Sequence, residues 1–313
     1  MRVILLGPQR RPTVDTAIRL LGEPGEQEGP VATVTAGWQE REPDDAELAK
    51  CLGGRDVNLR LYQRWLDVQE RDPEYAAGER RLSAILAELQ DLYLLRLDHA
   101  MQAVYALQRH EAGDTLRSEE VSAAVAAVRE LDAAHLRRGN EARLEFFDRL
   151  PPHDRPAIAE HRAAVTAALA QASVLAIAGG HVGVLAEVLH LFNVAAALKD
   201  TLNGTPVIAW SAGAMALTDR IVLFHDRAPQ GPGHPEVWGS GLSLVRDAVL
   251  LPHARARLLL DDAPRMAVLA RRFAPARCVP LETGTRIDLG PDGSWPPGTR
   301  VLGEDGRAVS DAA

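Results

Sequence analysis

The chain has 313 residues, a formal net charge of −8 at pH 7, 46% hydrophobic residues and 25% charged residues. This composition is ordinary for a globular protein and excludes a disordered chain, a collagen and a disulfide-rich mini-protein. Two cysteines, Cys51 and Cys278, are too few for a zinc ribbon or a disulfide framework. The negative charge argues against a wide nucleic-acid interface, because such a surface must neutralise phosphates.

No apolar run is long enough for a signal peptide core or a membrane span. The first run covers residues 3–6, and glycines and charged residues interrupt the longest candidate, residues 174–198. A span needs about 20 apolar residues. We therefore expect a soluble, cytoplasmic protein with no membrane partner.

The first 45 residues have the pattern of an α/β domain. Residues 2–6 form a short β-type run that ends at Gly7-Pro8, and residues 31–35 form a second, β-branched run. These two runs are predicted to be strands.

Residues 46–150 differ in composition, being rich in Ala, Leu, Glu, Gln and Arg. Apolar residues recur there at spacings of three and four, which predicts three or four helices with breaks near Asp72-Pro73 and Gly113-Asp114. Asp132 and His135 could place two metal ligands on one helix face, but a structural role is favoured because no second such pair supports a metal site. This segment is predicted to be an all-helical insertion serving as a lid, a dimerisation arm or a partner platform.

Residues 151–313 return to the α/β pattern and complete a discontinuous core domain with residues 1–45. Helices are predicted at 156–171 and 182–199, and a third can start after Ser211. Strands are predicted at 174–178, 206–210, 221–224, 249–251 and 278–281. Apolar strands that alternate with helices predict a doubly wound, mostly parallel sheet of the flavodoxin-like class. The tail from residue 291 is expected to be a turn-rich cap.

The segment 205–214 (TPVIAWSAGA) is the most informative for chemistry. A hydrophobic strand leads directly into Ser211, and small residues follow it, including Gly213. This pattern is typical of a nucleophile elbow, in which a serine occupies a sharp turn between a strand and a helix. The turn would also direct the N–H of Ala212 toward an oxyanion. The alternative is that Ser211 is an ordinary helix N-cap.

A second turn follows the predicted strand 174–178 and reads Gly179-Gly180-His181. Two glycines allow the backbone to approach a ligand closely and could supply the other half of an oxyanion hole. The alternatives are a simple strand-to-helix turn or a phosphate-binding turn. Nucleotide binding is the weaker interpretation, because the rest of a dinucleotide or Walker motif is missing.

A serine nucleophile requires a base and a group that orients the base. Among the histidines that follow Ser211, His253 lies at the end of a predicted strand, where a doubly wound sheet places its active site. Glu282 also follows a predicted strand, and Asp226 is the competing candidate for the orienting carboxylate.

These segments resemble the serine peptidase family of dipeptidase E and cyanophycinase, which has a class I glutamine amidotransferase-like fold. The resemblance is carried by Gly179-Gly180, by residues 210–214 (WSAGA), by Pro252-His253 and by Leu281-Glu282. Residues 31–37 (VATVTAG) are similar to the family's early strand. The resemblance covers about residues 1–45 and 150–290.

The resemblance implies a hydrolase of amide or peptide bonds that works through an acyl-enzyme. Ser211 would be the nucleophile, His253 the general base and Glu282 the residue that orients it. The N–H groups of Gly180 and Ala212 would bind the oxyanion. No metal and no cofactor are expected.

The family's substrates imply a small peptide or amide with an aspartyl residue. Gly179, His181 and Arg255 are the candidate substrate-binding residues, and Arg257 is a further arginine suited to a carboxylate. The family's turn often reads Gly-Gly-Gly-Asn, whereas here it reads AGGH at residues 178–181.

The alternative function is a catalytically inactive binding or scaffold protein that acts through its helical insertion, since this fold hosts both kinds of function. A cysteine amidotransferase is excluded because neither cysteine lies at an elbow. A homodimer formed through the insertion is also expected.

Overall fold

The structure is a computed structural model that describes residues 1–9, 29–111, 113–200, 204–227 and 233–310. Its centre is a six-stranded sheet in the order β10-β1-β5-β4-β2-β3. The strands of this sheet are β1 (Val3–Leu6), β2 (Val31–Val34), β3 (Asp56–Asn58), β4 (Val174–Ile177), β5 (Val207–Trp210) and β10 (Arg286–Leu289). All neighbouring pairs are parallel except β1 with β10, which confirms the predicted mostly parallel sheet.

Both faces of the central sheet are buried, which explains why its strands are continuous apolar runs. In β1, Val3 and Leu5 join the larger hydrophobic core, whereas Ile4 and Leu6 join a smaller cluster on the opposite face. This alternation follows from the two-residue period of a strand.

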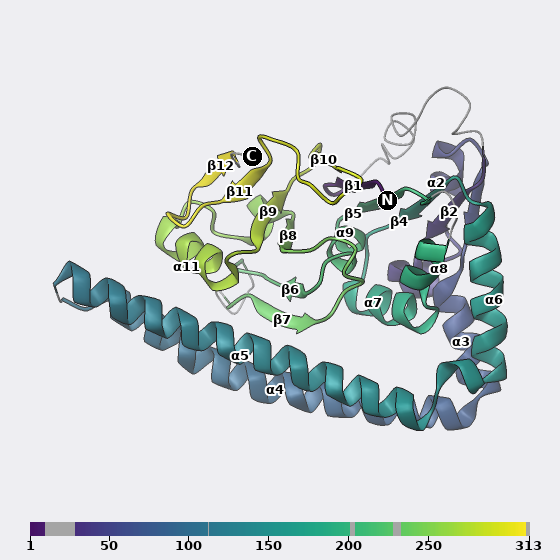
Figure 1. The fold of residues 1–313 in the computed structure, drawn as a ribbon, viewed down its shortest axis with the longest axis horizontal. Coiled ribbons are helices and arrows are strands. Elements are labelled where there is room, and N and C mark those ends of the chain that lie inside the picture. The colour runs from purple at the N-terminus through teal and green to yellow at the C-terminus, as the bar shows by residue number, and fades with distance from the viewer. Residues whose placement is uncertain (10–28, 112, 201–203, 228–232, 311–313) are drawn as a thin grey trace.

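Helices cover the two faces of the sheet (Figure 1). The smaller cluster is closed by Leu48 and Leu52, from α2 (Ala46–Cys51) and the residue that follows it. The larger core includes α6 (Pro156–Gln171) and α7 (Val182–Leu191). The predicted helix 182–199 is interrupted at Asn193, which has a φ of 53°, and continues as α8 (Val194–Asp200).

Further helical segments lie between these elements. They are the 3-10 segments η1 (Ala36–Arg41) and η2 (Pro152–Asp154), and the α-helices α3 (Leu61–Arg71), α9 (Ala212–Ala216), α10 (Ala254–Arg257) and α11 (Ala263–Phe273).

The remaining strands form three separate two-stranded sheets. These are the antiparallel pair β6 (Ile221–Leu223) and β7 (Glu236–Gly239), the parallel pair β8 (Ala248–Pro252) and β9 (Arg277–Leu281), and the antiparallel pair β11 (Arg300–Leu302) and β12 (Ala308–Ser310). The strands predicted near residues 221, 249 and 278 are therefore present, but outside the central sheet.

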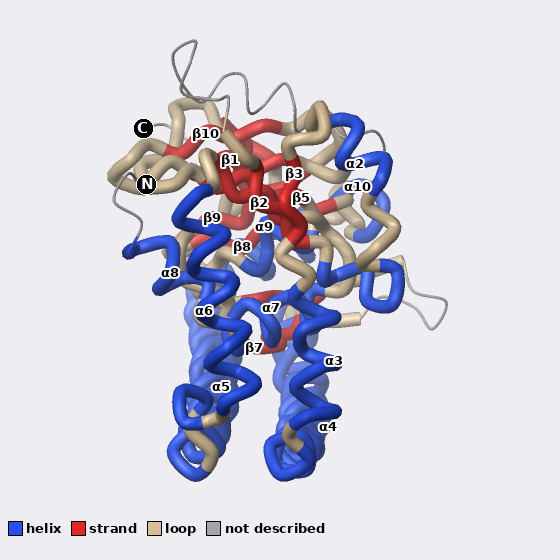
Figure 2. The backbone as a smooth tube through the Cα atoms, turned by 90° about the vertical axis from the view of Figure 1, so that its right-hand side faces the viewer, coloured by secondary structure: helices blue, strands red, loops and turns tan. Residues whose placement is uncertain are grey.

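Two long antiparallel helices, α4 (Pro73–Arg109) and α5 (Asp114–Arg149), form a helical hairpin that runs beside the α/β part (Figure 1). The predicted breaks at Asp72-Pro73 and Gly113-Asp114 are confirmed. The end of the hairpin where α4 meets α5 projects beyond α11. In Figure 2 most strands lie in the upper part of the molecule, the hairpin lies below them, and β7 is beside the hairpin.

The helical segment begins later in the chain than the expected boundary at residue 46. Residues 56–58 form β3, which pairs with β2 at the edge of the central sheet. Val57 is 43% exposed, so this edge strand lacks the buried apolar pattern of its neighbours. Continuous helical structure starts only with α3 at Leu61.

A buried polar network fixes the hairpin to the α/β part. The guanidinium of Arg272 on α11 donates to both carboxylate oxygens of Asp132 on α5, at 2.7 Å each, and to the hydroxyl of Tyr93 on α4 at 3.0 Å. It also donates to the carbonyl of Pro235 at 2.6 Å, and the N–H of Val237 in β7 donates to Tyr93. This network joins the hairpin, α11 and β7.

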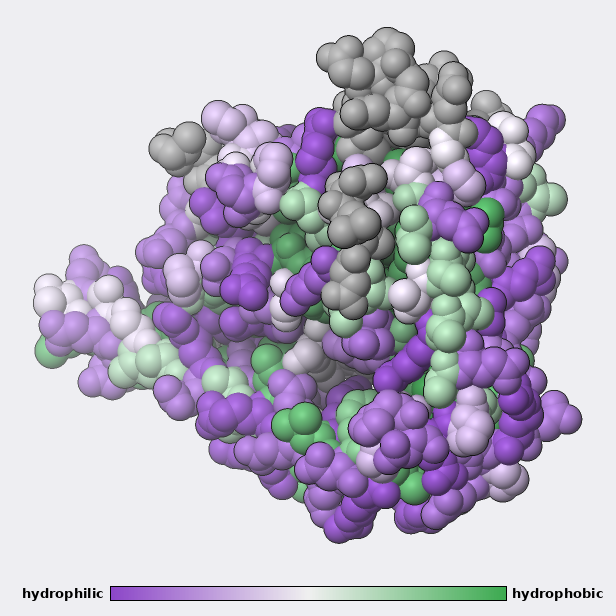
Figure 3. Space-filling view, turned by 45° about the vertical axis from the view of Figure 1, so that its right-hand side comes forward, coloured by the Kyte–Doolittle hydropathy of each residue, from purple (hydrophilic) through white to green (hydrophobic). Residues whose placement is uncertain are grey.

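None of the helices among the described residues combines the length and the apolar character needed to cross a membrane. The face of the molecule in Figure 3 is mostly hydrophilic, with apolar side chains in small groups.

Breaking the Arg272 network should destabilise the protein strongly, since Arg272 is 2% exposed and Asp132 is 4% exposed. Removal of one partner from a buried ion pair leaves an uncompensated charge and costs about 3–5 kcal/mol. We expect Arg272→Met to lower the free energy of unfolding by this amount in chemical denaturation. The double variant Arg272→Met/Asp132→Leu should lose less than the sum of the two single variants. The matched control is Arg271→Met on the exposed side of α11; an equal loss there would contradict this account.

A second ion pair joins the hairpin to α6 and makes stability depend on pH. Asp72 is the N-cap of α4 and accepts from the N–H of Tyr75 at 3.0 Å, while Arg155 Nε donates to it at 2.6 Å. The hydrogen bond from Arg155, with the help of Tyr75, holds the pKa of Asp72 below its usual value. The contribution to stability is therefore complete above the unfolded pKa of about 3.9 and is lost as the pH falls through the folded pKa.

We expect Asp72→Asn, which keeps an N-cap acceptor but removes the charge, to lower the free energy of unfolding by roughly 2 kcal/mol at neutral pH. The difference from the unmodified protein should shrink below about pH 4, when measured by urea denaturation across pH. Asp114→Asn, in the exposed first turn of α5, is the control with little expected effect. A difference for Asp72→Asn that is independent of pH would contradict the assignment.

Candidate active site

The chemistry-bearing residues of the α/β part meet at the carboxyl ends of parallel strands. Ser211 follows β5, the Gly179-Gly180 turn follows β4, and Gly37 follows β2. His253 and Glu282 follow β8 and β9, which are in register at Pro252 and Leu281. Open α/β sheets place their ligands at this end.

Ser211 occupies a backbone conformation that L-residues rarely adopt, with φ 53° and ψ −122°. Its N–H donates to the carbonyl of Leu6 at 3.3 Å, which fixes the turn against the neighbouring strand. Ser211 makes no side-chain cap hydrogen bond to α9. The strained turn between β5 and α9 favours the elbow over an ordinary N-cap.

Small residues are required around this turn. A Cβ on Gly179 would lie 2.9 Å from the Cβ of Ser211, and one on Gly213 would lie 2.7 Å from the carbonyl oxygen of Ala178. Gly180 has φ 129°, and a Cβ there would overlap the carbonyl of Gly37. These three glycines therefore allow the turns after β4 and β5 to pack together.

The backbone amides of Ala212 and His181 lie in these two turns. Ala212 is the first residue of α9, where an N–H has no partner within its own helix. The N–H of His181, which follows Gly180, donates to the carbonyl of Gly37 at 2.8 Å and so holds the glycine turn in place.

His253 is held by its backbone at the start of α10. It has a left-handed conformation, with φ 58° and ψ 33°, and its N–H donates to the carbonyl of Leu281 at 3.0 Å. The carboxylate of Glu282 accepts from the N–H of Arg255 at 2.7 Å and thereby caps the short helix that His253 begins. Gly7 packs directly against the backbone of Glu282 and leaves no space for a side chain.

Ser211 and His253 line one cavity, here called the Trp38 cavity, of about 630 Å³. Gly179 and Gly180 also line it, and Trp38 and Trp210 form aromatic walls. Its rim carries the charged residues Arg41, Asp44 and Glu47, of which Arg41 and Asp44 form an exposed ion pair. The predicted nucleophile, base and glycine turn are thus brought to one cavity.

A second cavity, here called the Leu94 cavity, has a volume of about 410 Å³ and also reaches Ser211. Gly180 and Ala212 line it on the side of the predicted oxyanion hole. Its wall includes Leu94, which comes from α4 of the hairpin. Further apolar walls are supplied by Val182, Met215, Leu223 and Phe224. The hairpin therefore contributes directly to the space in front of Ser211.

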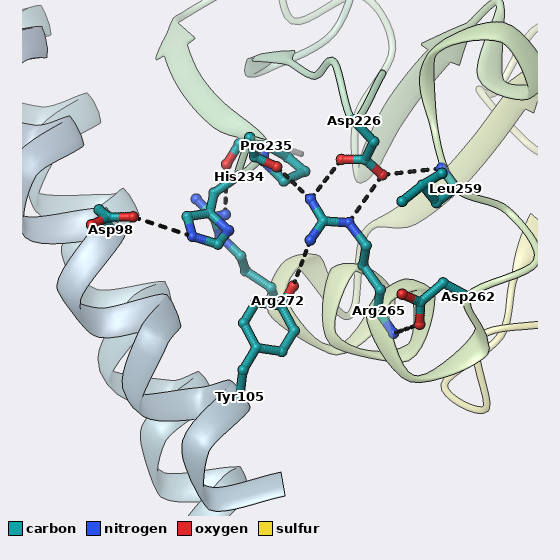
Figure 4. A network of polar contacts seen from close by, with 10 residues as sticks. Asp98, Tyr105, Asp226, His234, Pro235, Leu259, Asp262, Arg265 and Arg272 are labelled. Carbon is teal, nitrogen blue, oxygen red and sulfur yellow. Dashed lines mark hydrogen bonds and ion pairs between the residues drawn. The ribbon is translucent and has the colours of Figure 1, made fainter. Parts of the chain in front are cut away.

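Asp226, the other candidate for the carboxylate that orients His253, is bound by Arg265 and Leu259. Arg265 on α11 donates to its two carboxylate oxygens at 2.6 and 3.0 Å, and the N–H of Leu259 donates to one of them at 3.1 Å (Figure 4). Its side chain is fully buried. These contacts attach the segment after β6 to α11, and they engage both carboxylate oxygens.

Two of the predicted substrate-binding residues, Arg255 and His181, line neither the Trp38 cavity nor the Leu94 cavity. Arg255 lines a separate cavity with Glu282, whereas Arg257, two residues later, lines the Leu94 cavity. His181 caps α7, and its Nδ1 accepts from the N–H of Val184 at 3.2 Å. The short α10 turns Arg255 and Arg257 to different sides, which spacing alone did not resolve.

Trp38, Trp210 and Leu94 are site residues that sequence reasoning missed. Trp210 precedes the serine and Trp38 follows Gly37, so both stood beside recognised motifs. Leu94 carried no signal, because it belongs to a regular helical stripe and reaches the cavity only through the docking of the hairpin.

The Asp132 and His135 pair has a structural role here. Asp132 is bound by Arg272 and Tyr93, and the ring of His135 stacks on Tyr93 with centroids 4.1 Å apart. Burial lowers the pKa of His135. Within the described ranges, no group of three or more His, Cys, Asp or Glu residues is arranged to hold a metal ion.

Comparison with protein-family models gives a match over part of the chain. Residues 156–288 match the model of peptidase family S51. This segment contains the glycine turn, Ser211, His253 and Glu282. No curated protein matches the chain.

The strain at Ser211 predicts an unusual order of stabilities. A residue other than glycine in this conformation costs about 1–3 kcal/mol, and the greater unfolded-state entropy of glycine offsets only part of this. We therefore expect Ser211→Gly to be more stable than Ser211→Ala by roughly 1 kcal/mol in thermal unfolding. Ser118 is an exposed residue near the start of α5. There the alanine variant should be more stable than the glycine variant, because glycine disfavours a helix by about 1 kcal/mol relative to alanine. The same order at both positions would refute strain at Ser211.

Proposed function

Because residues 156–288 belong to peptidase family S51, the family of dipeptidase E and cyanophycinase, we propose that this protein is a serine peptidase that hydrolyses an amide bond of a small peptide. The observation that carries the proposal is that Ser211, on its strained turn, and His253 line the same cavity. A nucleophile and a base on separate strand ends can then act on one carbonyl group.

In the proposed mechanism the Oγ of Ser211 attacks the carbonyl carbon of the substrate while His253 accepts its proton. The negative oxygen of the tetrahedral intermediate receives hydrogen bonds from the N–H groups of Gly180 and Ala212. His253 then gives the proton to the leaving amine, the C–N bond breaks, and an acyl ester remains on Ser211. Water attacks this ester with His253 again as base, which releases the acid and restores the serine.

Glu282 is proposed as the positioning residue for His253. The carboxylate of Glu282 accepts a hydrogen bond from the N–H of Arg255 and so holds the first turn of α10, which begins at His253. This contact supports the proposed role. Asp226 is not assigned this role, because Arg265 and Leu259 already engage its carboxylate.

Arg257 is proposed to bind a substrate carboxylate in the Leu94 cavity. Its side chain is exposed and makes no hydrogen bond or ion pair within the described chain. A guanidinium pairs with a carboxylate through two parallel hydrogen bonds. This contact fits the aspartyl residue that the family resemblance implies, and it replaces Arg255 as the candidate.

A homodimer through the hairpin stays a prediction; Ile85, Leu92 and Leu95 are exposed on α4 and are the residues it would use.

The alternative function, a binding protein without catalysis, predicts that Ser211 does not react as a nucleophile. The serine's reactivity can be tested before any substrate is known.

We expect a fluorophosphonate probe to label the protein once, at Ser211. The Oγ–P bond forms, the P–F bond breaks, fluoride leaves and His253 takes the serine proton, so intact-mass spectrometry detects the adduct. Ser211→Ala should abolish labelling and all hydrolysis of a dipeptide panel, and His253→Ala should slow labelling by roughly 10²-fold or more. Ser243→Ala, at another serine with positive φ, is the control that should label normally. A wild-type protein that is neither labelled nor active on the panel would favour the binding protein.

A further inference from the structure

A third cavity lies outside the Ser211 site, between the hairpin and the α/β part. This cavity, here called the Arg143 cavity, has a volume of about 230 Å³ and is lined by residues of α4, α5, α7 and β7. It shares no lining residue with the Trp38 or Leu94 cavities. Its volume is below the roughly 300–1,000 Å³ of cavities that hold drug-sized ligands, so it fits a smaller molecule.

Arg143 on α5 is half-buried at this cavity and lacks a conventional partner. Its guanidinium carbon lies 5.8 Å from the centroid of the Trp238 ring, and it donates no hydrogen bond to any residue in the described part of the chain. Burial lowers the pKa of Arg143. A guanidinium has five N–H donors, and leaving them without acceptors in a half-buried position is costly. The side chain therefore favours an anionic occupant.

Glu187 on α7 lines the same cavity and carries the opposite charge. Desolvation raises the pKa of Glu187, while the nearby charge of Arg143 acts in the other direction. Within the described residues the two side chains attract each other electrostatically but do not form an ion pair or a hydrogen bond. The cavity is therefore lined by one positive and one negative side chain that are not paired with each other.

The rest of the cavity wall is apolar or neutral. Leu86, Leu89 and Leu136 supply the apolar part. Asn140 adds an amide whose oxygen already accepts from Ser240 at 3.0 Å.

We propose that the Arg143 cavity binds a free α-amino acid with an apolar side chain. Its carboxylate pairs with Arg143 and its ammonium group with Glu187, so that each buried charge of the protein meets an opposite charge of the ligand. The side chain lies against the leucines and the Trp238 ring. A single zwitterion thus satisfies both charges that the protein leaves apart.

The occupant would lie one side chain away from the glycine turn of the candidate active site. The Trp238 ring packs on the first turn of α7, where a Cβ on Gly183 would lie 2.9 Å from Trp238 Cζ2 and 3.1 Å from His181 Cε1. Amino acids are also products of the peptidase proposed above; this link alone rests on the proposed function, whereas the binding site does not.

The test is isothermal titration calorimetry of the full chain carrying Ser211→Ala, with leucine and phenylalanine as probes. We expect saturable binding of one molecule per chain. Arg143→Met and Glu187→Gln, on two different helices, should each weaken it by roughly tenfold or more, since each removes a charge-assisted hydrogen bond. N-acetyl-leucine and leucinamide, which each lack one charge, should be weakened similarly. Circular dichroism and thermal unfolding check that the variants are folded.

The control is Arg257→Met, which removes the free guanidinium of the Leu94 cavity and should leave binding unchanged. Loss of binding in Arg257→Met with retention in Arg143→Met would place the amino acid at the Ser211 site and overturn the proposal. So would the absence of saturable binding by any proteinogenic amino acid at millimolar concentration, checked also by saturation-transfer NMR. A protein that is neither labelled at Ser211 by the fluorophosphonate nor active on the dipeptide panel would reject the proposed function without affecting this result.

Discussion

The buried guanidinium of Arg272 is the contact on which the rest of the arrangement depends. By binding Asp132, Tyr93 and the carbonyl of Pro235 at once, it fixes α5, α4 and the start of β7 to α11. Such a charge is tolerated in the interior only when its hydrogen bonds are satisfied from several sides. The hairpin is therefore fixed to the α/β part about midway along α4 and α5, whereas its tip projects (Figure 1).

A second constraint, the parallel order of the strands, gathers the candidate site. Since the carboxyl ends of parallel strands share one edge, short apolar runs followed by Gly, Ser or His predict residues that meet in space. This is why Gly180 and Ser211 could be expected to lie close together; His253 follows β8 of a separate two-stranded sheet and lines the same cavity. The strands themselves were predictable because both faces are buried and each strand is a continuous apolar run.

What the sequence did not predict depends on contacts between distant segments. The edge strand β3 has an exposed face and lies in a helix-rich stretch, so no local pattern marks it. Leu94 lines the Leu94 cavity because the hairpin is held against the α/β part, and Arg272, which helps to hold it, is 178 residues further along the chain. Arg255 and Arg257 line different cavities because one turn of α10 separates them, and Asp226 is bound by Arg265, which no local pattern indicates.

The docked hairpin places two cavities along one face of β7. Glu236 lines the Leu94 cavity and Trp238 lines the Arg143 cavity, and residues two apart in a strand point to the same side. Between them, Gln90 of α4 donates to Glu236 at 3.2 Å. Because Gln90 lines the Arg143 cavity while Glu236 lines the Leu94 cavity, this hydrogen bond joins the linings of the proposed substrate space and the proposed amino-acid site. A ligand on either side would thus act on the same two side chains.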